Sequence, residues 1–232
     1  MCGRYSYTGN PNHVTTRLGI KSIPSQARYN IAPGQHAPVI RSVEGHPPMM
    51  DQLQWGLVPF WAKDPSIGFR TINARSEKAE TTGSFRAPFR YRRCLVLADG
   101  FFEWKKIGRD KQPWRLLMSD ESTFAMAGLW DHWTRPDGAV LETFTVLTTE
   151  ANELVQEVHD RMPVILEPEA WAPWLSQKVN QPASVRPFLK PYPADKMKSY
   201  PVSNLVNRVS NDTAKCIEPV AVPPEQTELF SF

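Results

Sequence analysis

The stretch CLVLADGFFEW, residues 94–104, is the strongest strand pattern in the sequence. It begins with a continuous apolar run, which is typical of a strand covered on both faces. We therefore predict one central strand here, with the Cys94 side chain packed inertly in the core. Near its end lies Glu103, a carboxylate between two aromatic residues. Burial there would raise the pKa of Glu103 and let it carry a proton. The alternative is a strand-end glutamate that faces water before Lys105.

Further strands and a few short helices are expected on either side of this stretch. The strands are predicted at residues 37–41, 49–58, 114–118, 123–130 and 141–148. Helices are predicted at the start of 11–27, at the end of 71–77, at 151–158 and at 168–175. Residues 176–202 are interpreted as a long surface loop, residues 204–208 as the start of a closing segment that returns to the core, and the tail from Pro223 as mobile. A chain of 232 residues predicts one large domain.

The composition excludes several classes of protein. Hydrophobic residues make up 41% and charged residues 22%, as in a globular protein with a substantial core. No apolar stretch approaches the roughly 18 residues that span a membrane, and no secretory signal is visible. The cysteines at 2, 94 and 216 form neither a disulfide framework nor a paired zinc motif, and the histidines are scattered. We expect no membrane, no metal, no cofactor and a reducing compartment, cytoplasmic or nuclear.

Basic and aromatic residues alternate in the middle of the chain, although the net charge is only +3. The basic residues are Arg70, Arg75, Arg86, Arg90, Arg92 and Arg93, and the aromatic ones are Phe69, Phe85, Phe89 and Tyr91. Such a mixture suits phosphate contacts and base stacking in nucleic acid. A solvated basic face is the alternative.

The N-terminal sequence MCGRY places Cys2 directly after the initiator methionine. Loss of Met1 would leave a free α-amine and a thiol on adjacent carbons. This 1,2-aminothiol condenses with an aldehyde to an imine, which the thiol closes to a thiazolidine. Intramolecular closure of this kind can have an effective molarity of roughly 10⁵ M, and an α-amine titrates near pH 7.7–8.0. The alternative is an ordinary, chemically idle second residue.

Three other residues have both a functional and a structural interpretation. His159 follows a predicted helix, where the helix dipole favours the imidazolium, so it is either an acid/base group or a helix cap. Asn73 precedes a predicted helix and could simply cap it. Trp61 lies in an aromatic cluster that could be core or could project as a stacking wedge.

Five motifs together resemble one family, the SRAP (SOS-response-associated peptidase) proteins. They are MCGRY (1–5), RYNIAPG (28–34), INARSE (72–77), ADGFFEW (98–104) and HDRMP (159–163). The resemblance implies a single α+β domain over residues 2–222, followed by a flexible tail at 223–232. Its sheets would be curved, largely antiparallel and barrel-like, with a few short helices around a DNA-binding groove. It also implies a sensor of abasic sites in single-stranded DNA that forms a covalent crosslink to the aldehyde of the ring-opened sugar.

The resemblance further implies a set of residue roles. Cys2 would be the nucleophile, Asn73 its orienting group, Glu103 a proton carrier and His159 the group that helps to open the sugar ring. Thr148 would line the pocket, with Asn30 beside it in a role that the motif does not define. The implied DNA contacts are Arg4, Arg75, Arg161, Pro33 and Trp61, with Arg86 as a further candidate. The family often has paired tryptophans where this chain has Trp61-Ala62, which predicts a smaller wedge.

Two other functions remain open from the sequence. One is a thiol peptidase that acts on other proteins, with Cys2 and His159 as a dyad. The other is a non-covalent reader of modified or single-stranded DNA. If the protein is the abasic-site sensor, its peptidase activity is the removal of its own Met1; removal by a methionine aminopeptidase is the alternative route. We expect a monomer whose partner is single-stranded DNA with abasic sites, in the nucleoid of a bacterium or the nucleus of a eukaryote.

Overall fold

The apolar run at residues 94–98 forms strand β6 (Arg93–Ala98), in which every residue is buried. The computed structural model describes residues 2–43, 46–176 and 181–221. Strand β6 lies between β3 (His36–Arg41) and β9 (Phe124–Thr134), antiparallel to both. The prediction of a central strand buried on both faces is therefore confirmed for this part of the stretch.

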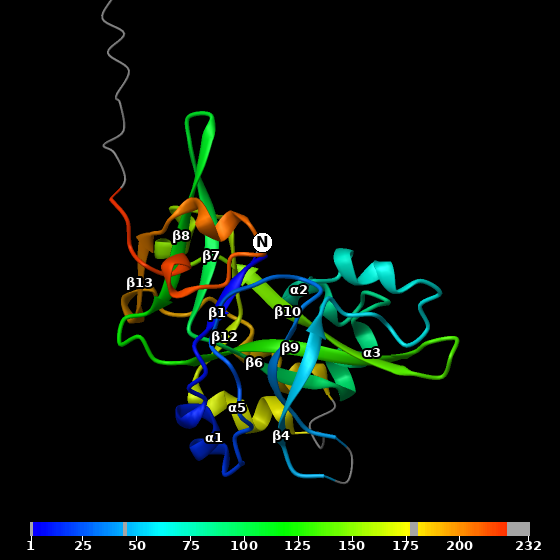
Figure 1. Cartoon of the computed structure of the whole chain (residues 1–232). Coiled ribbons are helices and arrows are strands. Elements are labelled where there is room, and N and C mark those ends of the chain that lie inside the picture. Colours follow the sequence, from blue (N-terminus) through cyan, green and yellow to red (C-terminus); the bar gives the residue numbers. More distant parts are fainter. Residues whose placement is uncertain (1, 44–45, 177–180, 222–232) are drawn as a thin grey trace, which may run out of the picture.

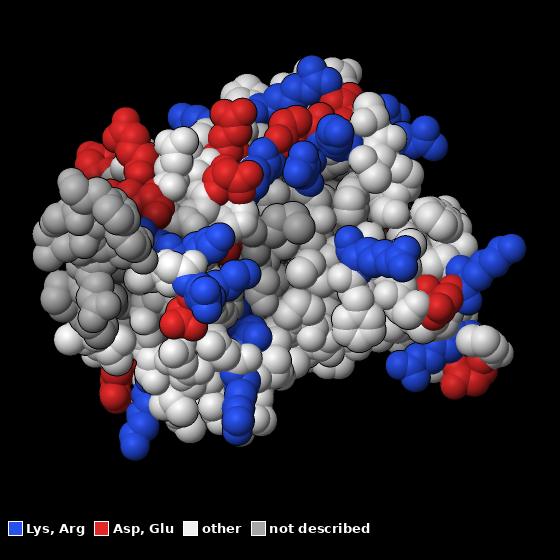
Figure 2. Space-filling view, turned by 90° about the horizontal axis from the view of Figure 1, so that it is seen from above, with Lys and Arg blue, Asp and Glu red and all other residues white. Residues whose placement is uncertain are grey.

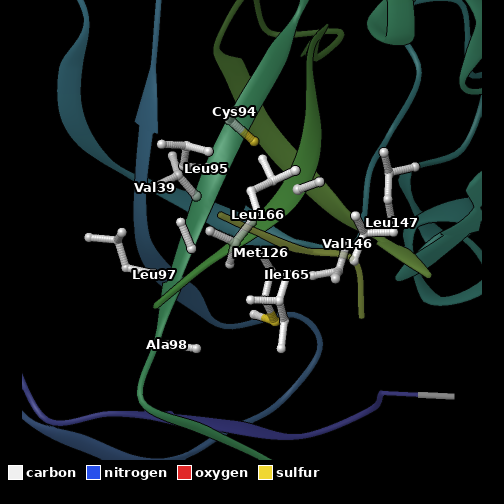
Figure 3. Packing of buried hydrophobic residues seen from close by; sticks show 14 of the residues in the cluster. Val39, Cys94, Leu95, Leu97, Ala98, Met126, Val146, Leu147, Ile165 and Leu166 are labelled. Atoms are coloured by element: carbon white, nitrogen blue, oxygen red, sulfur yellow. The ribbon is translucent and has the colours of Figure 1, made fainter. Parts of the chain in front are cut away.

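Five strands close on themselves into a barrel. Strand β10 (Val140–Glu150) pairs antiparallel with β9 and parallel with β4 (Met49–Trp55), and β4 pairs antiparallel with β3. Three short strands extend this sheet: β5 (Asn73–Arg75) and β11 (Arg161–Pro163) on β10, and β12 (Ile165–Leu166) on β9. Side chains from several of these strands meet in the core, among them Val39, Leu95, Leu97, Met126, Val146 and Ile165 (Figure 3).

The predicted single strand over 94–104 is two strands, and the break falls at Asp99. Beyond it the chain enters a second sheet as β7 (Gly100–Ile107). The Asp99 carboxylate is buried and accepts hydrogen bonds from Ser6 Oγ at 2.6 Å and Arg115 Nη2 at 2.9 Å. A side chain at Gly100 would collide with that guanidinium, because an added Cβ would lie 2.5 Å from Arg115 Nε. The Asp-Gly pair thus permits the change of sheet.

The second sheet has five strands in the order β13-β8-β7-β1-β2. They are β13 (Met197–Pro201), β8 (Asp110–Met118), β7, β1 (Tyr5–Tyr7) and β2 (Arg28–Ile31). The N-terminal strand β1 is therefore not an edge strand, since it lies between β2 and β7. Figure 1 shows the start of the chain beside β7 and β10, where the two sheets approach each other.

The helices are short and cover the outside of the sheets. They are α1 (Asn12–Leu18), α2 (Ser76–Ala79), α3 (Arg86–Tyr91), α4 (Glu153–Gln156) and α5 (Pro168–Leu175). Short 3₁₀ helices lie at η1 (Pro65–Arg70), η2 (Pro182–Ser184), η3 (Arg186–Phe188), η4 (Ala194–Lys196), η5 (Asn204–Asn207) and η6 (Ala214–Cys216). Within the described ranges, no helix is long and apolar enough to cross a membrane. The single α+β domain with barrel-like, largely antiparallel sheets agrees with the expectation from sequence.

Several predicted elements differ in extent from those observed, and two of them differ most. The helix predicted at 151–158 is observed only as α4, whose start is fixed by Asn152, since that side chain caps it by accepting a hydrogen bond from Val155 N. The loop predicted at 176–202 contains β13, an edge strand paired antiparallel with β8. Residues 177–180 and the predicted tail from Pro223 lie outside the described residues.

Candidate active site

Cys2 lies just before β1 and is fully buried. Its thiol lies 3.8 Å from the carbonyl oxygen of Arg4, and its own carbonyl accepts a hydrogen bond from Asn73 Nδ2 at 2.7 Å. Burial, and then the negative charge of Glu103, raises the pKa of the thiol to about 12. The thiol is therefore neutral at physiological pH, and the residue is held by its backbone.

Asn73 reaches Cys2 from the barrel sheet. It lies in β5, opposite Val146 of β10, and the N-cap position of α2 is taken by Arg75, two residues later. The capping interpretation of Asn73 is wrong, because its amide nitrogen is used on Cys2 instead. Its amide oxygen is buried and has no hydrogen-bond partner in the described part of the chain. An acceptor is therefore available beside the backbone of Cys2.

Trp55 fixes the position of both partners. Its indole Nε1 donates a 2.8 Å hydrogen bond to the carbonyl of Ile72, the residue before Asn73. Its ring meets the ring of Tyr5 edge to face, with centroids 5.1 Å apart. One buried side chain thus braces β1 against the segment that carries Asn73.

Glu103 lies on β7 and is only 3% exposed, so the alternative in which it faces water is wrong. Burial raises its pKa, while the positive charge of His159 acts in the opposite direction. Because Glu103 in turn acts on the thiol of Cys2, the three groups share one electrostatic environment. A buried carboxyl group with a raised pKa is suited to hold a proton and release it to a neighbouring group.

His159 follows α4, and its Nδ1 has two neighbours that require different forms of the ring. Asp160 Oδ1 lies 2.8 Å from Nδ1, and the backbone N–H of Arg161 lies 3.0 Å from the same atom. A protonated Nδ1 donates to Asp160, whereas a bare Nδ1 accepts from Arg161. The surroundings of His159 therefore offer a partner for either state of Nδ1, as a proton-transfer group requires.

Arg161, two residues along the chain from His159, is hydrogen-bonded to Thr148. Arg161 is 8% exposed, and its Nη2 donates to the carbonyl of Thr148 at 2.7 Å. Its guanidinium also forms a two-pronged ion pair with Glu77, at 2.5 Å to Oε1 and 2.9 Å to Oε2. This pair lowers the pKa of Glu77 to about 2. Sequence reasoning did not identify Glu77 as a partner, although a buried arginine in a predicted site demands a carboxylate.

Arg4 and Asn30 belong to a second network that holds the closing segment. Arg4 Nη1 donates to Asn30 Oδ1 at 2.8 Å and to the carbonyl of Val206 at 2.6 Å. The Asn30 amide nitrogen donates to the carbonyls of Val206, Arg208 and Asn211. Asn30, whose role the motif left undefined, thus ties the segment after η5 to β2. The predicted return of this segment to the core is confirmed.

The other residues predicted to contact DNA differ in how exposed their side chains are. Arg75 and Arg86 are exposed, Trp61 is half-exposed and Pro33 is partly buried. The loop of Trp61 is fixed from behind, because Phe60 N donates to Asp131 and Trp133 Nε1 donates to the carbonyl of Ala62. The face seen in Figure 2 carries Lys and Arg side chains around uncharged surface, with Asp and Glu side chains among them.

The basic and aromatic stretch is only partly a surface feature. Arg93 is buried and donates to the carbonyl of Trp174 at 2.6 Å, and Arg92 pairs with the buried Asp131 at 3.2 Å. Phe85 and Phe89 belong to the core. Neither a fully solvated basic face nor a continuous stacking surface fits this arrangement. Among the described residues, no cluster of three histidine, cysteine or acidic side chains could hold a metal ion.

Comparison with known proteins connects this arrangement to one family. The model of the SOS response associated peptidase (SRAP) family matches residues 1–209. The abasic site processing protein YoqW of Bacillus subtilis is 39% identical over 223 residues, which cover 94% of this chain and 99% of YoqW. YedK of Escherichia coli, also named an abasic site processing protein, is 33% identical, with 95% and 100% covered.

The fold agrees with the sequence match. A crystal structure of a protein from Bacteroides thetaiotaomicron superposes with a TM-score of 0.84 at 28% identity, covering 95% of this chain and all of that chain. A phage-related protein from Bordetella bronchiseptica gives 0.69 at 27% identity, with 87% and 94% covered. Sequence and fold both agree over nearly the whole chain, which therefore belongs to the SOS response associated peptidase (SRAP) family.

Proposed function

We propose that this protein captures abasic sites in single-stranded DNA by forming a covalent bond through Cys2. The observation that carries the proposal is that Asn73 on β5 bonds to Cys2, that Glu103 on β7 acts on its thiol, and that His159, after α4, acts on Glu103. The names of the relatives, abasic site processing proteins, indicate the substrate. All four groups come from one chain, so a monomer suffices.

The chemistry begins with loss of Met1, which frees the α-amine of Cys2. The abasic sugar must open to its aldehyde, and His159 is the group that we assign to the proton transfer. The amine adds to the aldehyde carbon, and the resulting carbinolamine loses water to form an imine. Thiol addition to the imine carbon then closes the thiazolidine, so that the net change is condensation with loss of one water.

Glu103 and Asn73 serve different steps of this sequence. A protonated Glu103 can donate to the departing hydroxyl, and the resulting carboxylate can accept the thiol proton during ring closure. Such positioned acid/base groups typically accelerate a step roughly 10²–10⁴-fold. Asn73 holds the Cys2 carbonyl, and its buried amide oxygen can accept an N–H of the freed amine.

The high pKa of the Cys2 thiol favours this function over a peptidase that acts on other proteins. A thiol peptidase needs a thiolate, which requires a lowered pKa. Here burial and Glu103 raise the pKa to about 12. An amine that attacks first, followed by a neutral thiol adding to an imine, does not need the thiolate at the start.

The test is incubation of the protein, with Met1 verified as absent, with single-stranded DNA that contains one abasic site. We expect a heat-stable adduct on denaturing electrophoresis, with the mass of protein plus DNA minus one water. Cys2→Ala should abolish it, and Cys94→Ala, which removes a thiol from the barrel core, should not. DNA with a tetrahydrofuran analogue, which has no aldehyde, should give no adduct. Absence of adduct from the processed protein would refute the proposal.

A further inference from the structure

Strand β13 is an edge strand, and one side of its backbone is open. Figure 1 shows it on the outside of the second sheet, next to β8. Even-numbered residues turn their backbone groups to β8, as Val202 N does in donating to the carbonyl of Pro113 at 3.0 Å. The N–H and C=O groups of Met197 and Ser199 therefore point the other way. There they have no backbone partner among the residues that the structure describes, and such an edge can pair with a further strand.

The last described residues already begin to pair with this edge. Val202 forms an antiparallel bridge with Pro219. The N–H of Val220 donates to the carbonyl of Pro201 at 3.0 Å. Because Pro201 is next to Val202 in the strand, its carbonyl points away from β8. The chain therefore reaches the open side of β13 with a defined direction and register.

The sequence that follows suits a continuation of the same register. Val222 would then oppose Ser199, and Pro224 would oppose Met197. Val222 has both an N–H and a C=O to exchange with Ser199, and Pro224 can still accept from the N–H of Met197. Pro223 would fall between them, where its missing N–H removes no bond to β13. Proline is found at such positions in edge strands.

A mainly apolar hollow of about 400 Å³ lies beyond the start of β13. Its wall is formed by α5 and by residues 187–193, and includes four prolines and the rings of Phe188 and Tyr192. Pro193, also in the wall, is the N-cap residue of η4, which leads directly into β13. No step of the proposed chemistry uses this hollow. A concave apolar wall of this kind favours apolar side chains as its occupants.

The same segment of chain that would pair with β13 can reach the hollow. Pro193 is four residues before Met197, so their Cα atoms are at most about 14 Å apart. Leu229 is five residues beyond Pro224, a stretch that spans up to about 17 Å. A segment paired with β13 as far as Met197 therefore brings Leu229 and the adjacent Phe230 to the apolar wall.

The charges around the hollow agree with this occupant. Both acidic residues of the wall already form ion pairs, one with Lys196 at 3.0 Å and the other with Arg17 at 2.7 Å. Lys190, the basic residue of the wall, has no ion pair within the described ranges. Glu228, directly before Leu229, has the opposite charge. An exposed pair of this kind adds little affinity, but it favours an acidic segment over a basic one.

We infer that residues 222–230 add a strand to the open edge of β13 and insert Leu229 and Phe230 into the hollow. The occupant is thus the protein's own C-terminal segment, in place of the flexible tail expected from the sequence. Its role is to cover an edge that would otherwise pair with another chain. The inference does not rest on the proposed function, and its tests use no DNA.

The first test fixes the register with a disulfide. Lys198 and Pro223 oppose each other in the inferred ladder at a non-hydrogen-bonded position, where Cα atoms lie about 4.5 Å apart. A disulfide spans this distance. We expect Lys198→Cys/Pro223→Cys to close at least about ten-fold faster than Lys198→Cys/Glu225→Cys, whose diagonal partners would lie about 7–8 Å apart. The native cysteines are buried, which protects them from the oxidant. Equal rates, or a disulfide that joins two chains, would overturn the inference.

The second test measures docking without new cysteines, as the rate at which a glutamate-specific protease cleaves after Glu225. We expect Leu229→Ser/Phe230→Ser to speed cleavage by about ten-fold or more, because burial of even one such side chain can supply that factor. Phe188→Ala, which alters only the wall, should act in the same direction. Phe69→Ala, which removes an exposed ring outside the hollow, should not.

Two outcomes of the cleavage experiment would count against the inference. Equal rates for the wild-type protein and the double tail variant would show that the two apolar side chains are not docked. Protection that increases with protein concentration would make a second copy the source of the segment, and so would overturn docking within one chain.

Discussion

The Arg161–Glu77 ion pair predicts a stability that depends on pH in a defined window. The change to make is Glu77→Gln, which keeps the shape of the side chain and removes its charge. The pKa of Glu77 falls from 4.5 to about 2 in the folded protein, which corresponds to roughly 3.4 kcal/mol at neutral pH. Half of the Glu77 side chain is exposed to water, so screening reduces the expected loss of unfolding free energy to about 1–2 kcal/mol.

The sign follows from the lowered pKa. A carboxyl group that is more acidic when folded stabilises the protein above its unfolded pKa, and this stabilisation is lost as the pH falls toward 2. At pH 3, roughly 60% of the difference between wild type and variant should have disappeared. The measurement is urea unfolding followed by tryptophan fluorescence at pH 7, 5, 4 and 3. Glu80→Gln is the matched control, since Glu80 pairs with the exposed Arg186. A difference that stays constant from pH 7 to pH 3 would refute this reasoning.

Two further predictions concern the buried carboxylate and a close backbone contact. Burial raises the pKa of Glu103, so its ionised form destabilises the folded protein at pH values above the unfolded pKa. Glu103→Gln should therefore raise the unfolding free energy at pH 8 and give no gain at pH 4. The same substitution should slow adduct formation. Denaturant unfolding at both pH values checks this, and an equal gain at each would contradict it. Gly68→Ala should lower the unfolding free energy by about 1–3 kcal/mol, since its Cβ would overlap the Gly56 carbonyl. Gly83→Ala, where no atom lies within 4 Å of the added carbon, serves as the control and should change little.

The sequence predicted elements well where burial produces a strong local pattern. Helix α5 matches its predicted bounds, and the apolar first half of the strand predicted at 94–104 is observed as β6, because continuous apolar runs and a proline at a helix start are local signals. The break at Asp99 was missed because apolar residues continue on both sides of it, although Asp-Gly pairs often interrupt strands. Strand β13 was missed because edge strands contain lysine and proline and so resemble loops.

Barrel closure depends on pairings that no local pattern encodes. Strand β10 reaches β4, about ninety residues earlier in the chain, and also turns back on β9. The same limit applies to the site. The sequence alone could not decide between capping and catalysis for Asn73, because its partner is 71 residues away. Glu77 was not identified as a partner for the same reason, since Arg161 is 84 residues from it.

The interior position of strand β1 has a consequence for the order in which the protein assembles. The surroundings of Cys2 depend on Asn73, 71 residues away, and on the hydrogen bond from Arg4 to Val206, which spans 202 residues. Contacts of such long sequence separation form late in folding. A nascent or partly unfolded chain would therefore carry its N-terminal cysteine without the groups assigned to its chemistry. If the proposed function is correct, reactivity toward aldehydes is coupled to completion of the fold, and the cell is spared indiscriminate capture of other aldehydes by unfinished copies.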